Sequence, residues 1–429
     1  MDKIVITGGR KLRGDVKVSG AKNAALPILA SVLLGGGECV VGNVPRVVDV
    51  LTMGKLLRLL GASVRTEGDR VVMKMDELRS SEAPYDLVRT MRASVVVLGP
   101  LLARWGEATV SLPGGCAIGS RPVNLHLAGL EKLGATVTVE HGYIKAKASR
   151  LKGGRICLDF PTVTGTENLM LAACLAEGTT VIENAAKEPE IVDLAAFLVK
   201  RGARIAGAGT DLITIEGVRE LRGADHEVIP DRIEAGTYLA AGAITGGDVC
   251  VKDCRPQHLE AVITKLRETG AEVAESKESV RLKASGRLRS VDVKTYPYPG
   301  FATDMQAQMM ACMCVAQGTS VITETVFESR FIHVPELRRM GAEIKVDGSH
   351  AVVTGTAKLS GAPVMASDLR ASAGLIVAGL AAEGETEIAR VYHLDRGYER
   401  IEEKLGGLGA AIRRVANAGQ PGQIAKAGA

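Results

Sequence analysis

Two sequence markers recur six times along the chain at a nearly constant interval. The first marker is a glycine followed by a short segment rich in β-branched residues, and its copies lie 66 to 72 residues apart: Gly37, Gly106, Gly178, Gly247, Gly318 and Gly384. The second marker is a Gly-Ala pair, and its copies lie 68 to 73 residues apart: Gly61, Gly134, Gly202, Gly270, Gly341 and Gly409. Two markers that keep the same phase over 429 residues predict six structural repeats.

Each repeat has the same predicted order of elements. After the first strand comes an amphipathic helix, such as 191–199, which the glycine of the Gly-Ala pair ends. Two further strands follow in most repeats, for example 203–206 and 212–215. A second helix that is apolar on all sides, such as 305–316 or 371–382, closes the repeat and is predicted to be buried.

Six repeats exceed what one hydrophobic core usually holds, since a single core rarely grows beyond about 250 residues. We therefore expect two α/β domains of three repeats each, with the buried helices inside and the sheets outside. The pattern is interrupted at 228–232, which predicts one domain at 21–229 and a second formed by 1–20 together with 230–416. Residues 3–18 have no local partner strand and are expected to pair with the far end of the chain. The Gly- and Ala-rich residues 417–429 are expected to form a flexible tail.

The charge balance and hydropathy exclude several classes of protein. A net charge of +4 is too small to favour nucleic-acid or membrane-surface binding. No apolar run reaches the ~18 residues of a membrane span, so no membrane insertion is expected. The first residues lack the layout of a signal peptide, which favours a cytoplasmic location. The sequence leaves the oligomeric state open.

Most of the eight cysteines are expected to be buried and reduced. Cys157, Cys174, Cys250, Cys312 and Cys314 lie in apolar strands or helices. Cys250 and Cys254 have the spacing of a ligand pair, but no second pair or histidine cluster accompanies them. We therefore expect no metal and no cofactor.

One repeat departs from the common template. The distance from the first marker to the Gly-Ala pair is 23 to 25 residues in five repeats and 28 in the second. The extra residues form a glycine-rich loop within 111–126 that carries Cys116, five residues before Arg121. A neighbouring guanidinium favours the thiolate, so this loop is predicted to be catalytic. The alternative is an ordinary surface loop with a stray cysteine.

Cations stand at the starts of several apolar helices. Such positions are unfavourable because a helix N-terminus is positively polarised, unless an anion binds there. Four predicted helices begin this way, at Lys22, Arg92, Arg232 and Arg370. The pattern predicts an anion-binding site. The alternative is a set of solvated cations that pair with neighbours such as Asp231, Glu234 and Asp368.

Six motifs spread through the repeats carry a specific resemblance. They are Lys-Asn-Ala-Ala-Leu-Pro at 22–27, Pro-Gly-Gly-Cys-Ala-Ile-Gly-Ser-Arg-Pro at 113–122, Pro-Asp-Arg-Ile-Glu at 230–234, Thr-Asp-Met-Gln-Ala-Gln at 303–308, Phe-Glu-Ser-Arg-Phe at 327–331 and Asp-Arg-Gly-Tyr-Glu-Arg at 395–400. With these motifs the chain resembles the UDP-N-acetylglucosamine 1-carboxyvinyltransferases, a family of bacterial enolpyruvyl transferases. The similarity runs from Met1 to about Arg414.

The resemblance implies a fold and a reaction. The fold would be a pair of inside-out α/β barrels with the active site in the cleft between the domains. The reaction would transfer the enolpyruvyl group of phosphoenolpyruvate to the 3-hydroxyl of UDP-N-acetylglucosamine and release phosphate, which opens cytoplasmic peptidoglycan synthesis. It requires an acid, a base and several cations.

The resemblance also implies roles for individual residues. Asp304 would accept the hydroxyl proton, and Cys116 would act as acid or in product release and react with the antibiotic fosfomycin. Lys22, Arg121 and Arg396 would hold the phosphate, while Arg92, Arg330 and Arg370 would assist the carboxylate. The other substrate-binding positions would be Asn23, Pro122, Val123, Asn124, Leu125, His126, Thr162, Val163, Thr164, Gly165, Arg232, Glu234, Val326 and Asp368. Phe160 and Pro161 stand where the family often has a lysine, so stacking or backbone contacts would replace that charge.

Two alternatives belong to other functions. A shikimate-pathway enolpyruvyl transferase shares the sixfold architecture, but the thiol-bearing loop and the motif at 395–400 favour the amino-sugar enzyme. A non-catalytic repeat scaffold would need neither the insertion with Cys116 nor cations against helix dipoles.

Overall fold

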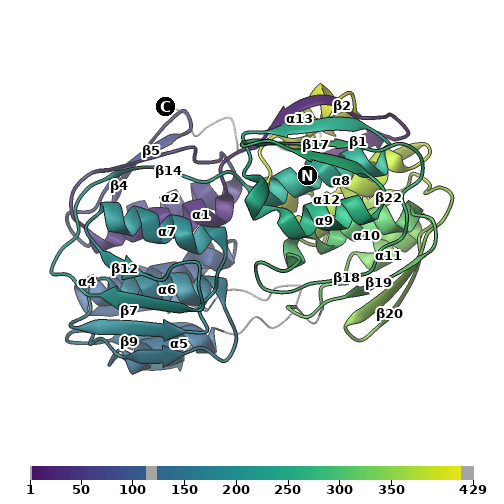
Figure 1. Cartoon of the computed structure of the whole chain (residues 1–429). Helices are drawn as coiled ribbons and strands as arrows, with labels where there is room; N and C mark the ends of the chain where they lie inside the picture. The colour runs from purple at the N-terminus through teal and green to yellow at the C-terminus, as the bar shows by residue number, and fades with distance from the viewer. Residues whose placement is uncertain (1, 113–122, 328, 417–429) are drawn as a thin grey trace. The chain divides into compact units, whose positions relative to one another are not determined.

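The computed structural model describes residues 2–112, 123–327 and 329–416. The predicted tail and most of the loop that carries Cys116 lie outside these residues. The chain forms two compact units. The first unit runs from Ser19 to Pro230, and the second combines the segment up to Val18 with the chain from Asp231 onward. In Figure 1 the central helices of each unit lie between its sheets.

The first unit contains three four-stranded sheets among its described residues. In strand order they are β14 (Asp225–Glu227), β3 (Cys39–Gly42), β5 (Arg70–Lys74) and β4 (Ser63–Glu67); β6 (Glu82–Ala83), β7 (Glu107–Ser111), β9 (Tyr143–Lys147) and β8 (Thr136–Glu140); and β10 (Arg155–Cys157), β11 (Thr179–Glu183), β13 (Leu212–Glu216) and β12 (Arg204–Ala206). The helices are α1 (Lys22–Ala30), η1 (Ser31–Leu34), α2 (Val48–Leu60), α3 (Tyr85–Val88), η2 (Arg92–Val97), α4 (Leu98–Trp105), α5 (Asn124–Lys132), α6 (Val163–Ala173) and α7 (Pro189–Lys200).

The described part of the second unit repeats this organisation. Its sheets are β22 (Pro363–Met365), β23 (Glu385–Ala389), β1 (Lys3–Thr7) and β24 (Ala411–Val415); β16 (Glu272–Glu275), β17 (Ser279–Lys283), β15 (Asp248–Lys252) and β2 (Arg13–Lys17); and β18 (Val293–Lys294), β19 (Thr319–Thr323), β21 (His350–Thr354) and β20 (Glu343–Asp347). Its helices are α8 (Arg232–Ile244), η3 (Pro256–His258), α9 (Glu260–Glu268), η4 (Thr303–Met305), α10 (Gln306–Val315), α11 (Val334–Arg339), α12 (Leu369–Ala381), η5 (Val391–Arg396) and α13 (Ile401–Gly407).

All six sheets of the described chain pair their strands in one pattern. One strand lies parallel to the first strand of a repeat, and two antiparallel strands complete the sheet, as in β10, β11, β13 and β12. Strand β1 pairs with both β23 and β24, where Val5 lies opposite Glu387 and Arg413. The expectation that the opening segment pairs with the far end of the chain is confirmed for β1. It is wrong for β2, which lies parallel to β15 in the middle of the chain.

The glycines of the Gly-Ala pairs end the amphipathic helices for a steric reason. All six have φ between 89° and 122°, a left-handed conformation that only glycine adopts without strain. The helix predicted at 191–199 is α7, and the strands predicted after it are β12 and β13.

The apolar helices form the cores. Every residue of α8 except Arg232 is buried, and so is every residue of α10 except Val315. Helix α12 is buried except at its first and last residues. A helix that is apolar on all sides is stable only when other elements surround it, and here the sheets do so.

Two of the predictions about cysteines are wrong. Cys157 is exposed and Cys250 is partly exposed. Both lie on strands, where alternate residues face opposite sides, and their neighbours Ile156 and Val251 occupy the buried side. Cys174, Cys312 and Cys314 are buried, as predicted.

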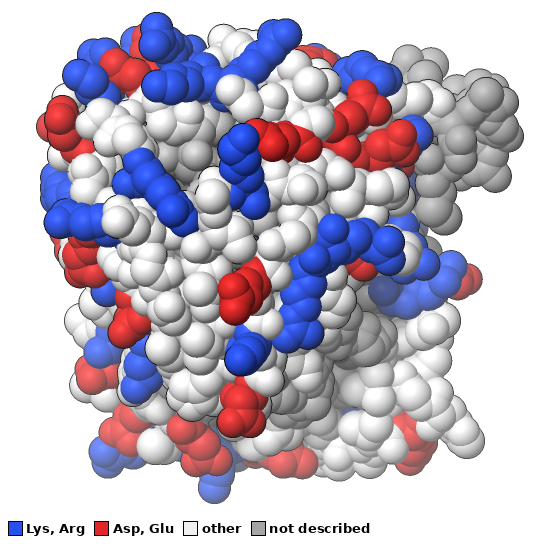
Figure 2. Space-filling view, turned by 90° about the vertical axis from the view of Figure 1, so that its right-hand side faces the viewer, with Lys and Arg blue, Asp and Glu red and all other residues white. Residues whose placement is uncertain are grey.

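Figure 2 shows basic and acidic side chains interspersed over one face of the molecule. Several of the exposed ion pairs of the second unit join neighbouring strands, such as Arg281 with Asp248 and Lys252 with Asp15. Exposed pairs of this kind contribute about 0–1 kcal/mol each. None of the helices in the described ranges combines the length and apolarity needed to cross a bilayer.

Candidate functional site

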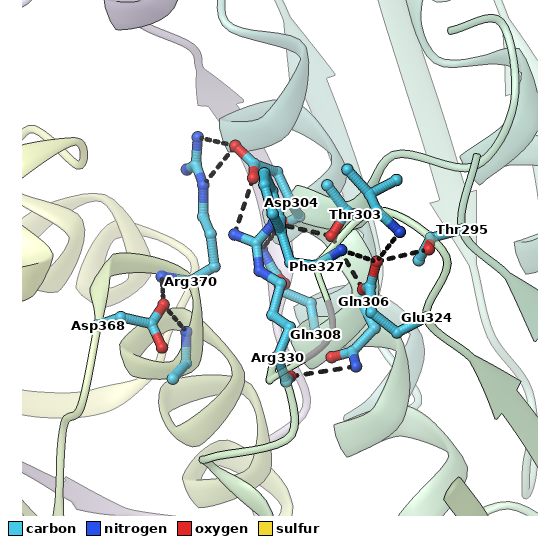
Figure 3. A network of polar contacts seen from close by, with 12 residues as sticks. Thr295, Thr303, Asp304, Gln306, Gln308, Glu324, Phe327, Arg330, Asp368 and Arg370 are labelled. Carbon is cyan, nitrogen blue, oxygen red and sulfur yellow. Dashed lines mark hydrogen bonds and ion pairs between the residues drawn. The ribbon is translucent and has the colours of Figure 1, made fainter. Parts of the chain in front are cut away.

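The carboxylate of Asp304 is held between two arginines in the second unit (Figure 3). Nη2 of Arg330 donates to Oδ1 at 2.8 Å, while Nε and Nη2 of Arg370 donate to Oδ2 at 3.0 and 2.9 Å. The side chain of Asp304 is 25% exposed, whereas those of Arg330 and Arg370 are 7% and 4% exposed. The structure therefore brings together three residues that the sequence assigns to the site, with the carboxylate as the most accessible of them.

Close packing of two helices places Asp304 beside Arg370. Asp304 lies in η4, which leads into α10, and Arg370 lies in the first turn of α12. One turn further along each helix, a Cβ atom at Gly374 would lie 2.9 Å from both the Cβ and the carbonyl oxygen of Ala307. Glycine at this position lets the helices approach closely enough for the ion pair to form.

We expect Gly374→Ala to separate α12 from α10. The added methyl group should cost about 1–3 kcal/mol of stability, which is typical of overpacking. It should also lower kcat of the transfer reaction that the resemblance implies, because Arg370 moves away from Asp304. Thermal unfolding and steady-state kinetics measure both effects. Gly406→Ala is the matched control, because a Cβ there meets no atom within 4 Å. Wild-type values for Gly374→Ala would contradict the role of this contact.

A second set of hydrogen bonds holds Arg330 in place. Its Nη1 donates to Thr303 Oγ1 at 2.8 Å, and that hydroxyl donates to Oε2 of the buried Glu324 at 2.9 Å (Figure 3). Oε1 of Glu324 accepts from Thr295 and from the backbone N–H groups of Val326 and Phe327. The predicted substrate-binding residue Val326 thus lies in a loop that is anchored to the same network.

The two arginines determine the protonation state of Asp304. Burial alone would raise its pKa, but the charges of Arg370 and Arg330 and the hydrogen bonds they donate hold the pKa well below its usual range. Burial alone would likewise lower the pKa of Arg370, but the charge of Asp304 raises it above its ordinary value. Asp304 and Arg370 are therefore both ionised at neutral pH.

The acidic neighbours suggested as partners for the cations have other roles. Asp368 caps α12 by accepting the N–H groups of Arg370 and Ala371, and Asp231 caps α8 by accepting those of Ile233 and Glu234. Arg370 is buried and its guanidinium pairs with Asp304, so the alternative of a solvated Arg370 that pairs with Asp368 is wrong.

Other predicted residues of the second unit lie at the starts and ends of its helices. Glu234 is 2% exposed and accepts Lys404 Nζ at 2.6 Å and the hydroxyl of Tyr238 at 2.9 Å. Arg232, the first residue of α8, lies over the ring of Tyr298. Arg396 is the last residue of η5.

In the first unit, Lys22 opens α1 and forms a buried ion pair with Asp49 at 2.6 Å. Asn23 follows it in the first turn, and no side chain of the described residues caps this helix. Arg92 opens the predicted second helix, but the first part of that helix is the 3₁₀ helix η2, which continues into α4. Three consecutive valines in η2 disfavour α-helical packing, and Ser94 bonds back to the carbonyl of Met91.

Histidine 126 joins two of the predicted substrate-binding stretches. It lies on α5, after Val123 and in the same turn as Asn124 and Leu125, and is 3% exposed. Its Nδ1 is 3.1 Å from Nδ2 of Asn168, whose Oδ1 accepts the N–H of Gly99 at 2.7 Å. The amide orientation assigns the ring proton to Nε2, which lies 3.5 Å from Thr164 Oγ1 in α6. Thr162 caps α6 by accepting the N–H of Gly165, and Val163 is the first residue of that helix.

Burial, together with the charge of Arg92, lowers the pKa of His126 from 6.5 to about 4. As the pH falls, His126 of the unfolded chain takes up a proton before His126 of the folded chain does. Its contribution to the free energy of unfolding is therefore fully present above pH 6.5 and is lost as the pH falls toward 4.

We expect the free energy of unfolding of His126→Gln to fall less between pH 7 and pH 4 than that of the wild type, by up to about 3 kcal/mol. Thermal unfolding between pH 7 and pH 4 measures it, with His350→Gln on the exposed surface as the control. An unchanged pH dependence in His126→Gln would contradict the assignment.

Cys116, Arg121 and Pro122 lie outside the described residues.

Residues 6–405 match the family model of EPSP synthase (3-phosphoshikimate 1-carboxyvinyltransferase). A UDP-N-acetylglucosamine 1-carboxyvinyltransferase of Anaeromyxobacter sp. (strain Fw109-5) is 62% identical over 96% of this chain and 99% of its own length. A second one, from Geobacter metallireducens, is 59% identical over 97% of this chain and 100% of its own length. The chain belongs to the UDP-N-acetylglucosamine 1-carboxyvinyltransferase family.

Solved structures agree with this family assignment. The enolpyruvyl transferase NikO from Streptomyces tendae superposes with a TM-score of 0.87 at 27% identity, covering 97% of this chain and 99% of that one. EPSP synthase from Acinetobacter baumannii superposes with a TM-score of 0.73 at 18% identity, over 97% and 100%, which shows the fold alone. The family fold is thus a mixed α/β structure with many small sheets.

Several polar residues near the site were not predicted from the sequence. Asp49 pairs with Lys22, Asn168 orients His126, and Gln308 of α10 lies one turn after Asp304. One signal was present in the sequence. Asn168 and Gln308 are polar residues in helices that are otherwise largely apolar, and such residues need a buried partner.

Proposed function

We propose that this protein transfers the enolpyruvyl group of phosphoenolpyruvate to the 3-hydroxyl of UDP-N-acetylglucosamine and releases phosphate. The names of relatives about 60% identical to the chain support this acceptor. The observation that carries the chemistry is the carboxylate of Asp304 between Arg330 and Arg370. A base flanked by two cations suits an acceptor hydroxyl that reacts beside an anionic substrate.

The reaction is an addition followed by an elimination. A proton adds to the methylene carbon of phosphoenolpyruvate, and the sugar oxygen bonds to the central carbon as Asp304 takes the hydroxyl proton. Loss of a proton from the new methyl group then re-forms the double bond as the bond to phosphate breaks. We assign Cys116 as the proton donor and Lys22, Arg121 and Arg396 to the phosphate. No metal or cofactor is required.

The arginines would also control when Asp304 becomes a base. With both guanidiniums bound, its pKa lies well below its usual range, which makes it a poor proton acceptor. When the carboxylate of phosphoenolpyruvate binds Arg330 and Arg370, its negative charge offsets their positive charges, and the pKa of Asp304 rises. The basicity of Asp304 therefore rises only when the second substrate is present, with Arg92 assisting.

We assign the sugar nucleotide to the residues that the family resemblance implies. In the first unit these are Asn23, Val123 to His126 and Thr162 to Gly165, together with Pro122. In the second they are Arg232, Glu234, Val326 and Asp368. The buried bonds of His126 and the caps of α6, α8 and α12 fix the backbones that carry these residues.

We also infer that each unit is an inside-out α/β barrel of three repeats and that the enzyme acts in the cytoplasm. The common strand order of the sheets and the burial of the central helices support the barrel.

Phosphate release from phosphoenolpyruvate tests the proposal. We expect release that depends on UDP-N-acetylglucosamine and yields its enolpyruvyl ether, detected by mass spectrometry. Shikimate 3-phosphate replaces the sugar nucleotide in a parallel assay. Release with shikimate 3-phosphate alone would establish the alternative transferase, and no release with either acceptor would favour a non-catalytic scaffold.

A further inference from the structure

Tyrosine 398 lies beside the Asp304–Arg370 pair and has no role in the function proposed above. Its side chain is 2% exposed, and the guanidinium of Arg370 lies 5.5 Å from the centre of its ring. Cation–π attraction at this distance stabilises a buried guanidinium and restricts its orientation.

Two polar contacts fix the phenol itself. Thr237 of α8 donates its hydroxyl proton to the carbonyl of Ile233 at 2.8 Å, so its oxygen is left to accept from Tyr398 at 2.9 Å. Nε2 of Gln308 lies 3.3 Å from the Tyr398 oxygen and also donates to the carbonyl of Asp304 at 3.0 Å. Residues from α8 and α10 thus hold the edge of the ring and leave its face to Arg370, from α12.

The nitrogen atoms of the Arg370 guanidinium differ in their hydrogen bonds. Nε and Nη2 donate to Asp304, whereas Nη1 is buried and meets no hydrogen-bond acceptor among the residues that the structure describes. A buried donor without an acceptor is costly, and the negative face of an aromatic ring is the main compensation that this environment provides. Without the ring, the guanidinium would gain by turning toward solvent or toward a bound anion.

We propose that Tyr398 is a positioning residue that holds Arg370 in the plane in which it can bind Asp304 and an anionic substrate group together. The inference rests on the proposed function. When a substrate carboxylate also binds Arg370, the ring keeps the guanidinium in contact with Asp304. The guanidinium then binds both anions and does not leave Asp304 for the substrate.

Two substitutions separate the ring from its hydroxyl. Tyr398→Leu removes the aromatic face and should lower kcat roughly 3- to 30-fold, with the KM for UDP-N-acetylglucosamine unchanged. Tyr398→Phe keeps the face and should retain kcat within about 3-fold of wild type. Leu380→Ala, at the opposite end of α12, is the control for lost packing and should lower the unfolding temperature without this loss of kcat.

The decisive measurement repeats Tyr398→Leu in an Arg370→Lys background, using single turnovers with excess enzyme. If Tyr398 acts through Arg370, Tyr398→Leu should lower the single-turnover rate of the Arg370→Lys enzyme by less than about 2-fold. The effects of substituting two neighbouring residues of one network are not additive. An equal cost in both backgrounds, or a Tyr398→Phe enzyme as slow as Tyr398→Leu, would overturn the inference. A wild-type protein that releases no phosphate would instead refute the proposed function, so the two failures are distinct.

Discussion

Asp304→Asn is expected to lower kcat for phosphate release by about 10² to 10⁴-fold, the usual effect of losing a general base. The amide cannot accept the proton of the attacking hydroxyl, whereas its size and position are nearly those of the carboxylate. The KM for UDP-N-acetylglucosamine should change little, because the base acts in the chemical step. Rapid-quench measurement of phosphate formation tests this directly.

Folding must be separated from chemistry in this experiment, because Asp304 neutralises two arginines that are almost fully buried. Loss of the carboxylate leaves their charges uncompensated and is expected to lower stability. Asp248→Ala is the matched control, since it removes another aspartate that an arginine binds through two nitrogens, at 2.7 and 2.8 Å, on an outer sheet. Near-normal turnover of Asp304→Asn would reassign Asp304 to a structural role.

Fosfomycin is expected to inactivate the enzyme completely by alkylating Cys116, and faster when UDP-N-acetylglucosamine is bound. Its phosphonate resembles the phosphate of the substrate, and its epoxide requires a thiolate. Burial raises the pKa of Cys254 to about 11 and those of Cys174 and Cys314 to about 12, so these side chains remain unreactive thiols. Cys116→Asp keeps a proton donor without sulfur, and should stay active and become resistant.

Cys157 provides the control, because it is an exposed thiol. Cys157→Ser should be inactivated at the wild-type rate, and peptide mapping should find the adduct at Cys116. An adduct at Cys157 or Cys250, or full inactivation of Cys116→Asp, would remove Cys116 from the mechanism.

The secondary structure could be predicted from the sequence wherever it depends on local periodicity and on glycine. Helix α7, strands β12 and β13 and the left-handed glycines after the amphipathic helices follow directly from such patterns. The α/β class is confirmed. The 3₁₀ start at Arg92 could not be predicted, because the apolar pattern of η2 and α4 is continuous and only the crowding of three valines separates them.

The site could be predicted only in part, because its geometry depends on packing between distant segments. The spacing of Asp304 and Arg370 in the sequence carries no information about their contact, which follows from the close approach of Gly374 to Ala307. The role of the cations at helix starts could be predicted from the unfavourable position of a positive charge at a helix N-terminus. Their partners, Asp49 for Lys22 and Asp304 for Arg370, come from other helices and could not be identified that way.

The position of β1 between β23 and β24 has a consequence for biosynthesis. A ribosome synthesises β1 before any residue of β23 or β24, the strands that flank it. Strand β1 therefore stays unpaired until most of the chain has been synthesised. The strands of the first unit lie within 39–227 and can find all their partners earlier. We therefore expect the first unit to become resistant to protease on the ribosome, while the second unit acquires its last sheet only when β24 leaves the exit tunnel.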